Sequence, residues 1–183
     1  MQLDSPGYAQ FVDPDSTSRL RAEGEDPDRL LDAAIHADNQ VLDAAQQGGA
    51  LAALHLCRGG STGRWLADGD ADALAERLFT RLRCGRLLLD CRAERPARFR
   101  PLRFVPAGMV VALGLVSTTA GETESSDDLL RLIDQASRVV PLEQLAISPR
   151  CGFASSQVGN PITADDQWRR LELVAELARE VWP

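Results

Sequence analysis

The fold is indicated first by the stretch Ala50-Leu51-Ala52-Ala53-Leu54-His55-Leu56-Cys57, a short apolar run that follows two glycines. A run of this length behind a turn signal is typical of a buried strand. Residues i and i+2 of a strand point to the same side, so His55 and Cys57 would aim an imidazole and a thiolate at one point. Zinc accepts both ligand types. We therefore expect a strand that carries part of a metal site at its end.

Outward from this stretch, apolar runs alternate with segments of helical periodicity. We expect further strands at 2–4, 87–90, 109–116 and 145–148, and helices at 30–45, 70–83, 127–139 and 163–181. Helix-start signals precede three of these helices: Asp26-Pro27, Ser125-Ser126, and Thr163 with Asp166 three residues on. Strand–helix alternation with apolar strands predicts an α/β fold with a parallel sheet.

Strong metal-ligand types fall at the ends of three predicted strands. They are His55, Cys57, Asp90 and Cys151. Chemistry in parallel α/β folds gathers at the carboxyl ends of the strands, so we expect these four side chains to lie near one another. Cys91 is a poorer candidate than Asp90, because neighbouring residues of a strand point to opposite faces.

Length, composition and net charge exclude several classes of protein. The chain has 183 residues, 44% of them hydrophobic, which predicts a single domain over residues 1–183. A net charge of −7 and a pI near 4.9 argue against a nucleic-acid surface. No apolar stretch reaches membrane-spanning length and no signal pattern opens the chain, so we expect no membrane partner and a cytoplasmic location. In that compartment the four cysteines bind metal or stay reduced.

Several motifs resemble the cobalamin-independent methionine synthase family, and above all its short, single-barrel type. The matching stretches are Asp4-Ser5-Pro6, His55-Leu56-Cys57-Arg58-Gly59, Pro101-Leu102-Arg103-Phe104-Val105-Pro106, Gly114-Leu115-Val116-Ser117, Ser148-Pro149-Arg150-Cys151-Gly152-Phe153-Ala154-Ser155 and Asp165-Asp166-Gln167-Trp168. The resemblance covers nearly the whole chain, but only the C-terminal part of the family's barrel.

The resemblance implies the C-terminal part of a (β/α)8 TIM barrel, with about five parallel strands. It also implies a Zn2+ ion held by His55, Cys57, Asp90 and Cys151. The family usually has Glu where this chain has Asp90, whose side chain is one methylene shorter. Asp4 falls on the family residue that holds the amino group of homocysteine, although a turn-capping Asp before a Pro is an equally good interpretation of that residue.

The implied activity is zinc-dependent transfer of a methyl group to the thiol of homocysteine, which forms methionine. This is the 5-methyltetrahydropteroyltriglutamate–homocysteine S-methyltransferase type. The folate-using members carry a histidine that donates a proton, whereas the matching stretch Ser117-Thr118-Thr119-Ala120 has no titratable group. The methyl donor therefore stays open between a folate, a corrinoid and another compound. An alternative is alkyl transfer to another thiol, as in epoxyalkane:coenzyme M transferase.

We also expect the barrel to be incomplete. Such barrels typically need about 250 residues, and the family places the first strand of this chain near the middle of its barrel. About five strands cannot close, so the first and last would leave unpaired edges. We expect a C-terminal fragment or half of a split enzyme, weakly active or inactive alone, that pairs as a homodimer or with a complementing N-terminal half-chain. A non-catalytic remnant is the alternative.

Overall fold

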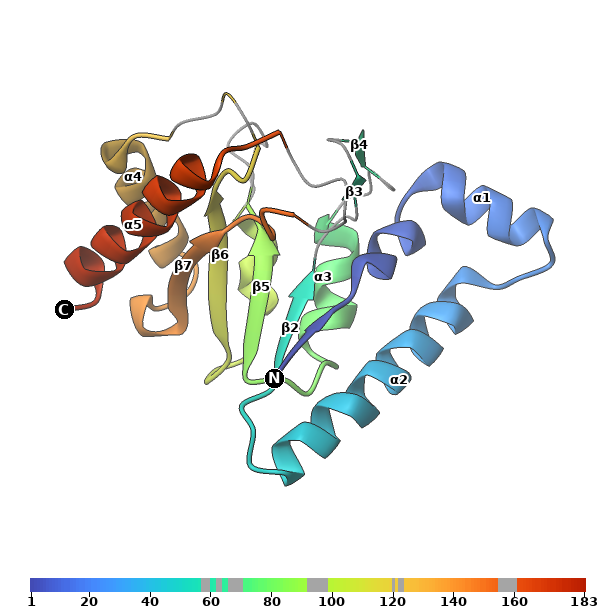
Figure 1. The fold of residues 1–183 in the computed structure, drawn as a ribbon. Helices are drawn as coiled ribbons and strands as arrows, with labels where there is room; N and C mark the ends of the chain where they lie inside the picture. Colours follow the sequence, from blue (N-terminus) through green and yellow to red (C-terminus); the bar gives the residue numbers. More distant parts are fainter. Residues whose placement is uncertain are drawn as a thin grey trace.

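The structure, a computed structural model, describes residues 1–56, 60–61, 64–65, 71–91, 99–119, 121, 124–154 and 161–183. Five parallel strands form its main sheet, in the order β1-β2-β5-β6-β7. The strands are β1 (Gln2–Asp4), β2 (Ala53–Leu56), β5 (Arg86–Asp90), β6 (Val110–Val116) and β7 (Leu145–Pro149). The predicted α/β class with about five parallel strands is confirmed (Figure 1).

Helices connect these strands. They are α1 (Pro14–Ala22), α2 (Pro27–Gln47), α3 (Ala71–Phe79), α4 (Ser126–Ser137) and α5 (Ala164–Val181), with short 3-10 helices η1 (Pro6–Phe11), η2 (Arg100–Phe104) and η3 (Leu142–Gln144). A small antiparallel pair, β3 (Gly60–Ser61) and β4 (Arg64–Trp65), follows β2. Helix α1 was not expected from the sequence. It begins at Pro14, behind Asp13, whose side chain accepts a hydrogen bond from the Ser16 backbone N–H.

The helix starts predicted from the sequence are confirmed. The side chain of Asp26 accepts from the backbone N–H of Asp28 at the start of α2, and Ser125 caps α4 in the same manner. Thr163 and Asp166 form a reciprocal capping box at α5. Each cap gives an otherwise unpaired N–H a partner, which fixes where its helix begins.

The two faces of the sheet are covered to different degrees. On one face the row Leu54, Leu87, Val111 and Leu145 is buried under helices. On the opposite face the register row continues from His55 through Leu88, Ala112 and Ala146, the last three only half-buried. In Figure 1 the strands are seen with α3 behind them and α2 and α5 at the sides. The less covered face is the one that would line the inside of a barrel.

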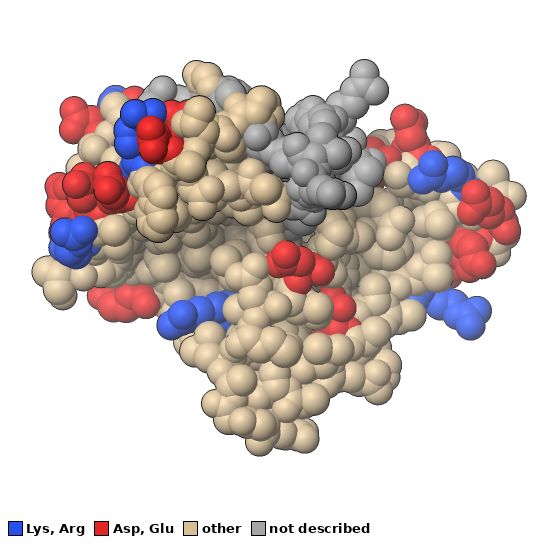
Figure 2. Space-filling view, in the orientation of Figure 1, with Lys and Arg blue, Asp and Glu red and all other residues tan. Residues whose placement is uncertain are grey.

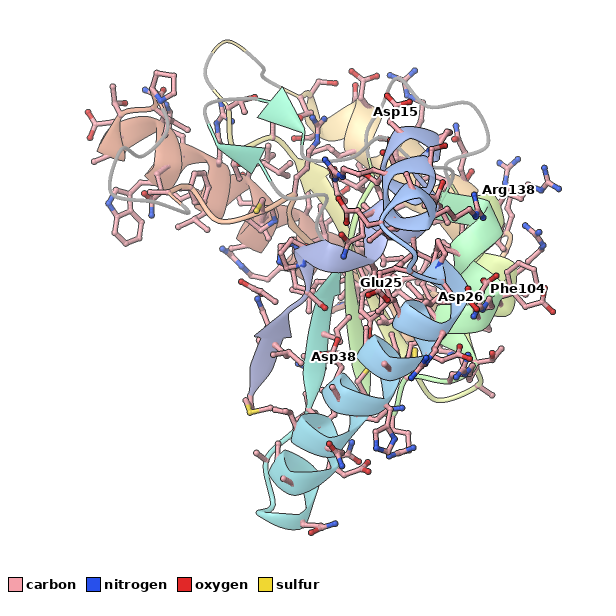
Figure 3. All side chains as sticks on the ribbon, turned by 90° about the vertical axis from the view of Figure 1, so that its right-hand side faces the viewer. Asp15, Glu25, Asp26, Asp38, Phe104 and Arg138 are labelled. Atoms are coloured by element: carbon pink, nitrogen blue, oxygen red, sulfur yellow. The ribbon has the colours of Figure 1, made fainter. Side chains whose placement is uncertain are left out.

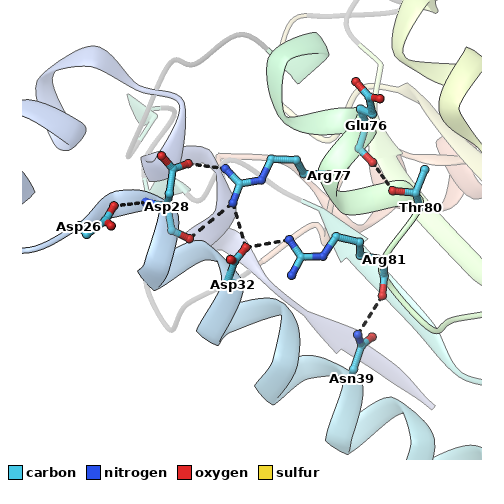
Figure 4. Close-up of polar contacts among 8 residues, drawn as sticks. All are labelled: Asp26, Asp28, Asp32, Asn39, Glu76, Arg77, Thr80 and Arg81. Carbon is cyan, nitrogen blue, oxygen red and sulfur yellow. Dashed lines mark hydrogen bonds and ion pairs between the residues drawn. The ribbon is translucent and has the colours of Figure 1, made fainter.

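Polar contacts fix α2 to the segment that carries α3 (Figure 4). Asn39, which is buried, donates from its amide to the carbonyl of Arg81 at 2.9 Å and accepts from the backbone N–H of Arg83 at 2.8 Å. Asp32 accepts from Arg77 at 2.9 Å and from Arg81 at 2.7 Å. The guanidinium of Arg81 holds the pKa of the Asp32 carboxyl below its usual range. These contacts hold the helix before β2 against the helix after it and the turn that follows.

The main sheet is open within the described part of the chain, with β1 and β7 at its edges. Figure 2 shows charged side chains gathered over α4 and α5 on one side and over α1 on the other, with acidic side chains between them and an uncharged surface at the bottom of the view. None of the helices in the described ranges is long and apolar enough to cross a membrane.

Candidate metal and thiol site at the carboxyl ends of the strands

His55 lies on β2 and is only 6% exposed. Its Nδ1 is 3.2 Å from Oδ1 of Asp4, the residue opposite it on the neighbouring strand β1. The same carboxylate oxygen accepts from the amide of Gln2 at 2.7 Å. A histidine that donates from Nδ1 to a carboxylate presents the lone pair of Nε2 to a metal, an arrangement common around zinc. The local geometry of His55 therefore fits a ligand role.

Asp90 ends β5 and lies on the same side of the sheet as His55. The register pairs His55 with Leu88, so Asp90 is two residues further along the neighbouring strand. Side chains two residues apart on a strand share a face. Cys91, the next residue, is 5% exposed and belongs to the hydrophobic core.

Cys151 follows the end of β7 and is half-buried. Cys57, the fourth predicted ligand, lies outside the described residues. Within the described ranges, no group of three or more His, Cys, Asp or Glu side chains is close enough to hold a metal ion. The structure thus places His55, Asp90 and Cys151 at the same end of the sheet without joining them into a cluster.

A buried polar network supports the loops at this end of the sheet. The Arg150 guanidinium lies 3.0 Å from Oε1 of Glu124, with side chains 9% and 15% exposed. The same oxygen accepts from the Ser117 backbone N–H at 2.9 Å. Arg170, from α5, donates to the carbonyls of Ser117 and Thr119. The segment after β6 is therefore held from β7, from α5 and by Glu124.

Sequence reasoning did not find the roles of Glu124 and Arg170. Arg150 precedes the candidate ligand Cys151, and that adjacency was the one signal present. Nothing in the spacing shows that Glu124 returns to Arg150, because the two residues come from different connections of the sheet.

A second cluster fixes the segment after Asp4. The hydroxyls of Ser5 and Tyr8 both donate to Oδ2 of Asp38 on α2, at 2.9 and 2.8 Å (Figure 3). Burial, with the hydrogen bond to Asp38, raises the pKa of Tyr8 above its ordinary value. The phenol therefore keeps its proton and remains a donor, which holds the end of β1 against α2.

Two curated relatives match the whole chain. They are the uncharacterized proteins YxjG and YxjH of Bacillus subtilis (strain 168), 38% and 36% identical over 183 residues. The match covers all of this chain and 48% of each relative, so the chain spans about half their length. No protein-family model matches the sequence.

Two solved structures have a fold similar to that of this chain. The chain is similar to a candidate vitamin-B12-independent methionine synthase from Listeria monocytogenes, with a TM-score of 0.71 and 27% identity over 100% of this chain and 48% of the other. A B12-independent methionine synthase from Shewanella sp. W3-18-1, solved with selenomethionine, gives a TM-score of 0.63 at 18% identity, over 98% of this chain and 48% of that one. The second match shows a shared fold only. The five-stranded sheet thus has the fold of about half of a methionine-synthase-like chain.

Proposed function

We propose that this chain supplies the zinc-binding part of a transferase that moves a methyl group to the thiol of homocysteine to form methionine. The observation that carries the proposal is the similarity, over the whole chain, to the Listeria candidate methionine synthase. The position of His55, Asp90 and Cys151 at one end of a parallel sheet supports it, because such sheets place their chemistry there. His55, Cys57, Asp90 and Cys151 are the proposed ligands.

Bound zinc would hold a thiol as thiolate at neutral pH and so supply an activated nucleophile. The contacts and exposure of Asp4 fit both metal binding and substrate binding. Asp4 keeps Nδ1 of His55 engaged, which leaves Nε2 for the metal. Asp4 is also exposed enough, at 63% of its side chain, to receive a substrate ammonium group.

Pairing with a second polypeptide is part of the proposal. Within the described residues β1 and β7 are the edge strands of the sheet, and Leu88, Ala112 and Ala146 leave the barrel-lining face half-buried. A complementing half-chain, or a second copy of this chain, would cover that face and those edges. The predicted cytoplasmic location belongs to the proposal too, because cysteines that bind metal stay reduced in that compartment.

The experiment is zinc content by plasma mass spectrometry on the full chain, purified under reducing conditions. We expect close to one zinc per chain in the wild type and almost none in Cys151→Ser. The matched control is Cys84→Ala, which removes a cysteine of the hydrophobic core and should keep its zinc. Zinc at the same level in all three proteins would contradict the proposed site. Absence of zinc in the wild type would favour a non-catalytic remnant or a site completed by a partner.

Mixing with a complementing N-terminal half-chain distinguishes those two, because a site completed by that partner should gain zinc on mixing and a non-catalytic remnant should not. Separately, a zinc-loaded monomer by sedimentation that methylates homocysteine would contradict the need for a second half.

A further inference from the structure

Gly114, on β6, has backbone of two neighbouring segments pressed against it. A Cβ added there would lie 2.6 Å from the carbonyl oxygen of Leu89 and 2.9 Å from Cα of Arg150. Real Cβ atoms essentially never show contacts under 3.0 Å, and neither of these atoms belongs to a flexible side chain. Only glycine lets the chain that leaves β7 pass this close to β6.

Arg150, the residue that passes over Gly114, is held by contacts of both its backbone and its side chain. The backbone N–H of Arg150 donates to the carbonyl of Val116 at 2.8 Å, beyond an irregularity of register between Gly114 and Val116. Its guanidinium forms the buried ion pair with Glu124. Because Cα atoms of consecutive residues are about 3.8 Å apart, fixing Arg150 restricts Cys151 closely.

The close approach of Arg150 to Gly114 also places the start of the Cys151 segment near the end of β5, because Asp90 pairs with Gly114 in the register of β5 and β6. A side chain at this position would clash with the backbones of Leu89 and Arg150, so the segment after β7 could no longer pass this close to β5 and β6.

We propose that Gly114 and Glu124 are positioning residues that seat Cys151 for metal binding. Gly114 gives the backbone of Arg150 its path across β6, and Glu124 locks the Arg150 side chain after that crossing. This inference rests on the proposed function, since it assumes that Cys151 is a ligand. It adds two residues that touch neither the metal nor the substrate.

The experiment titrates the full-length chain with Co2+, whose thiolate-to-cobalt charge-transfer absorption reports a bound cysteine directly. The variants are Gly114→Ala and Glu124→Gln. Each should weaken cobalt binding by about 10–100-fold, the range expected when the support of a ligand is lost, and should lower the charge-transfer intensity. The control Gly85→Ala makes the same change where the nearest atom to the added Cβ is 3.9 Å away, and should leave both unchanged.

Glu124→Gln keeps the inference testable if Gly114→Ala does not fold, because a glutamine oxygen can still accept from the Ser117 N–H. Unchanged cobalt affinity and spectrum in Glu124→Gln, even with a lowered melting temperature, would overturn the inference and leave the proposed function standing. Absence of cobalt binding in the wild type would instead count against the proposed function. In that case the inference is tested without metal, by the rate at which iodoacetamide alkylates Cys151, measured from peptide masses. This rate should rise several-fold in Glu124→Gln and stay unchanged in Gly85→Ala. Equal alkylation rates in the two variants would overturn the inference.

Discussion

Nδ1 of His55 and Oδ1 of Asp4 lie 3.2 Å apart, across the parallel strands β1 and β2. This contact joins the candidate zinc ligand to the candidate substrate-binding residue. Asp4 therefore has two roles to be separated. It orients the imidazole, as carboxylates commonly do behind zinc-bound histidines, or it receives the ammonium group of homocysteine.

Asp4→Ala separates these roles. If the carboxylate orients His55, zinc affinity should fall by about 10–100-fold, as is usual when the partner of a metal-bound histidine is removed. The measurement is competition for zinc with a chelator of known affinity. Asp134→Ala, which removes an exposed carboxylate paired with Arg138 on α4, should leave zinc affinity unchanged. Unchanged zinc affinity in Asp4→Ala, with a higher KM for the thiol substrate, would assign Asp4 to substrate binding alone.

The sequence was sufficient to predict the sheet and most of the helices. The apolar strands at 87–90 and 109–116 and the caps at Ser125 and Thr163 are local signals, and the structure places strands and helix starts there. Parallel order follows from alternation of strands and helices alone. The similarity to methionine-synthase-like structures agrees with the family resemblance read from the motifs.

The supports of the site could not be predicted in the same way. The ion pair of Glu124 with Arg150 and the contact of Gly114 with the Arg150 backbone depend on how two connections return to the sheet. The hydrophobic periodicity of the sequence does not show where a connection returns to the sheet. Zinc binding and the ligand role of Cys57, which lies outside the described residues, stay predictions.

Arg170 provides a test of the network around the loop after β6. The side chain is 9% exposed and donates to the carbonyls of Ser117 and Thr119. Arg170→Met keeps much of the buried stem but leaves both carbonyls without this donor. Hydrogen bonds to charged groups contribute about 1.5–3 kcal/mol each, so we expect the two lost bonds to lower the free energy of unfolding by at least about 3 kcal/mol. Urea denaturation followed by circular dichroism measures it.

The matched control is the neighbouring residue. Arg169→Met removes an arginine whose side chain is 69% exposed and whose partner, Asp166, is only three residues away on the same helix. Such surface pairs contribute little to stability. Equal urea midpoints for the two variants would show that Arg170 does not hold the loop.

Cys84 leads to a prediction about alkaline pH. Burial raises the pKa of its thiol from 9.0 to about 11. Between these two values the unfolded chain loses the thiol proton while the folded chain keeps it, so the unfolded state binds fewer protons and stability falls as pH rises. The contribution of the neutral buried thiol is fully present below about pH 9 and is lost progressively up to about pH 11. At about 1.4 kcal/mol for each pH unit between these two pKa values, we expect the loss to be about 2–3 kcal/mol.

Comparison with Cys84→Ala isolates this contribution from other groups that titrate in the same range, including Tyr8. Urea denaturation of both proteins at steps from about pH 8 to 11 gives two stability curves. The wild-type curve should fall toward that of Cys84→Ala as pH rises, because the variant has no thiol to ionise. Parallel curves would mean that the Cys84 thiol ionises equally easily in the folded and unfolded chains, which would contradict its burial against the core.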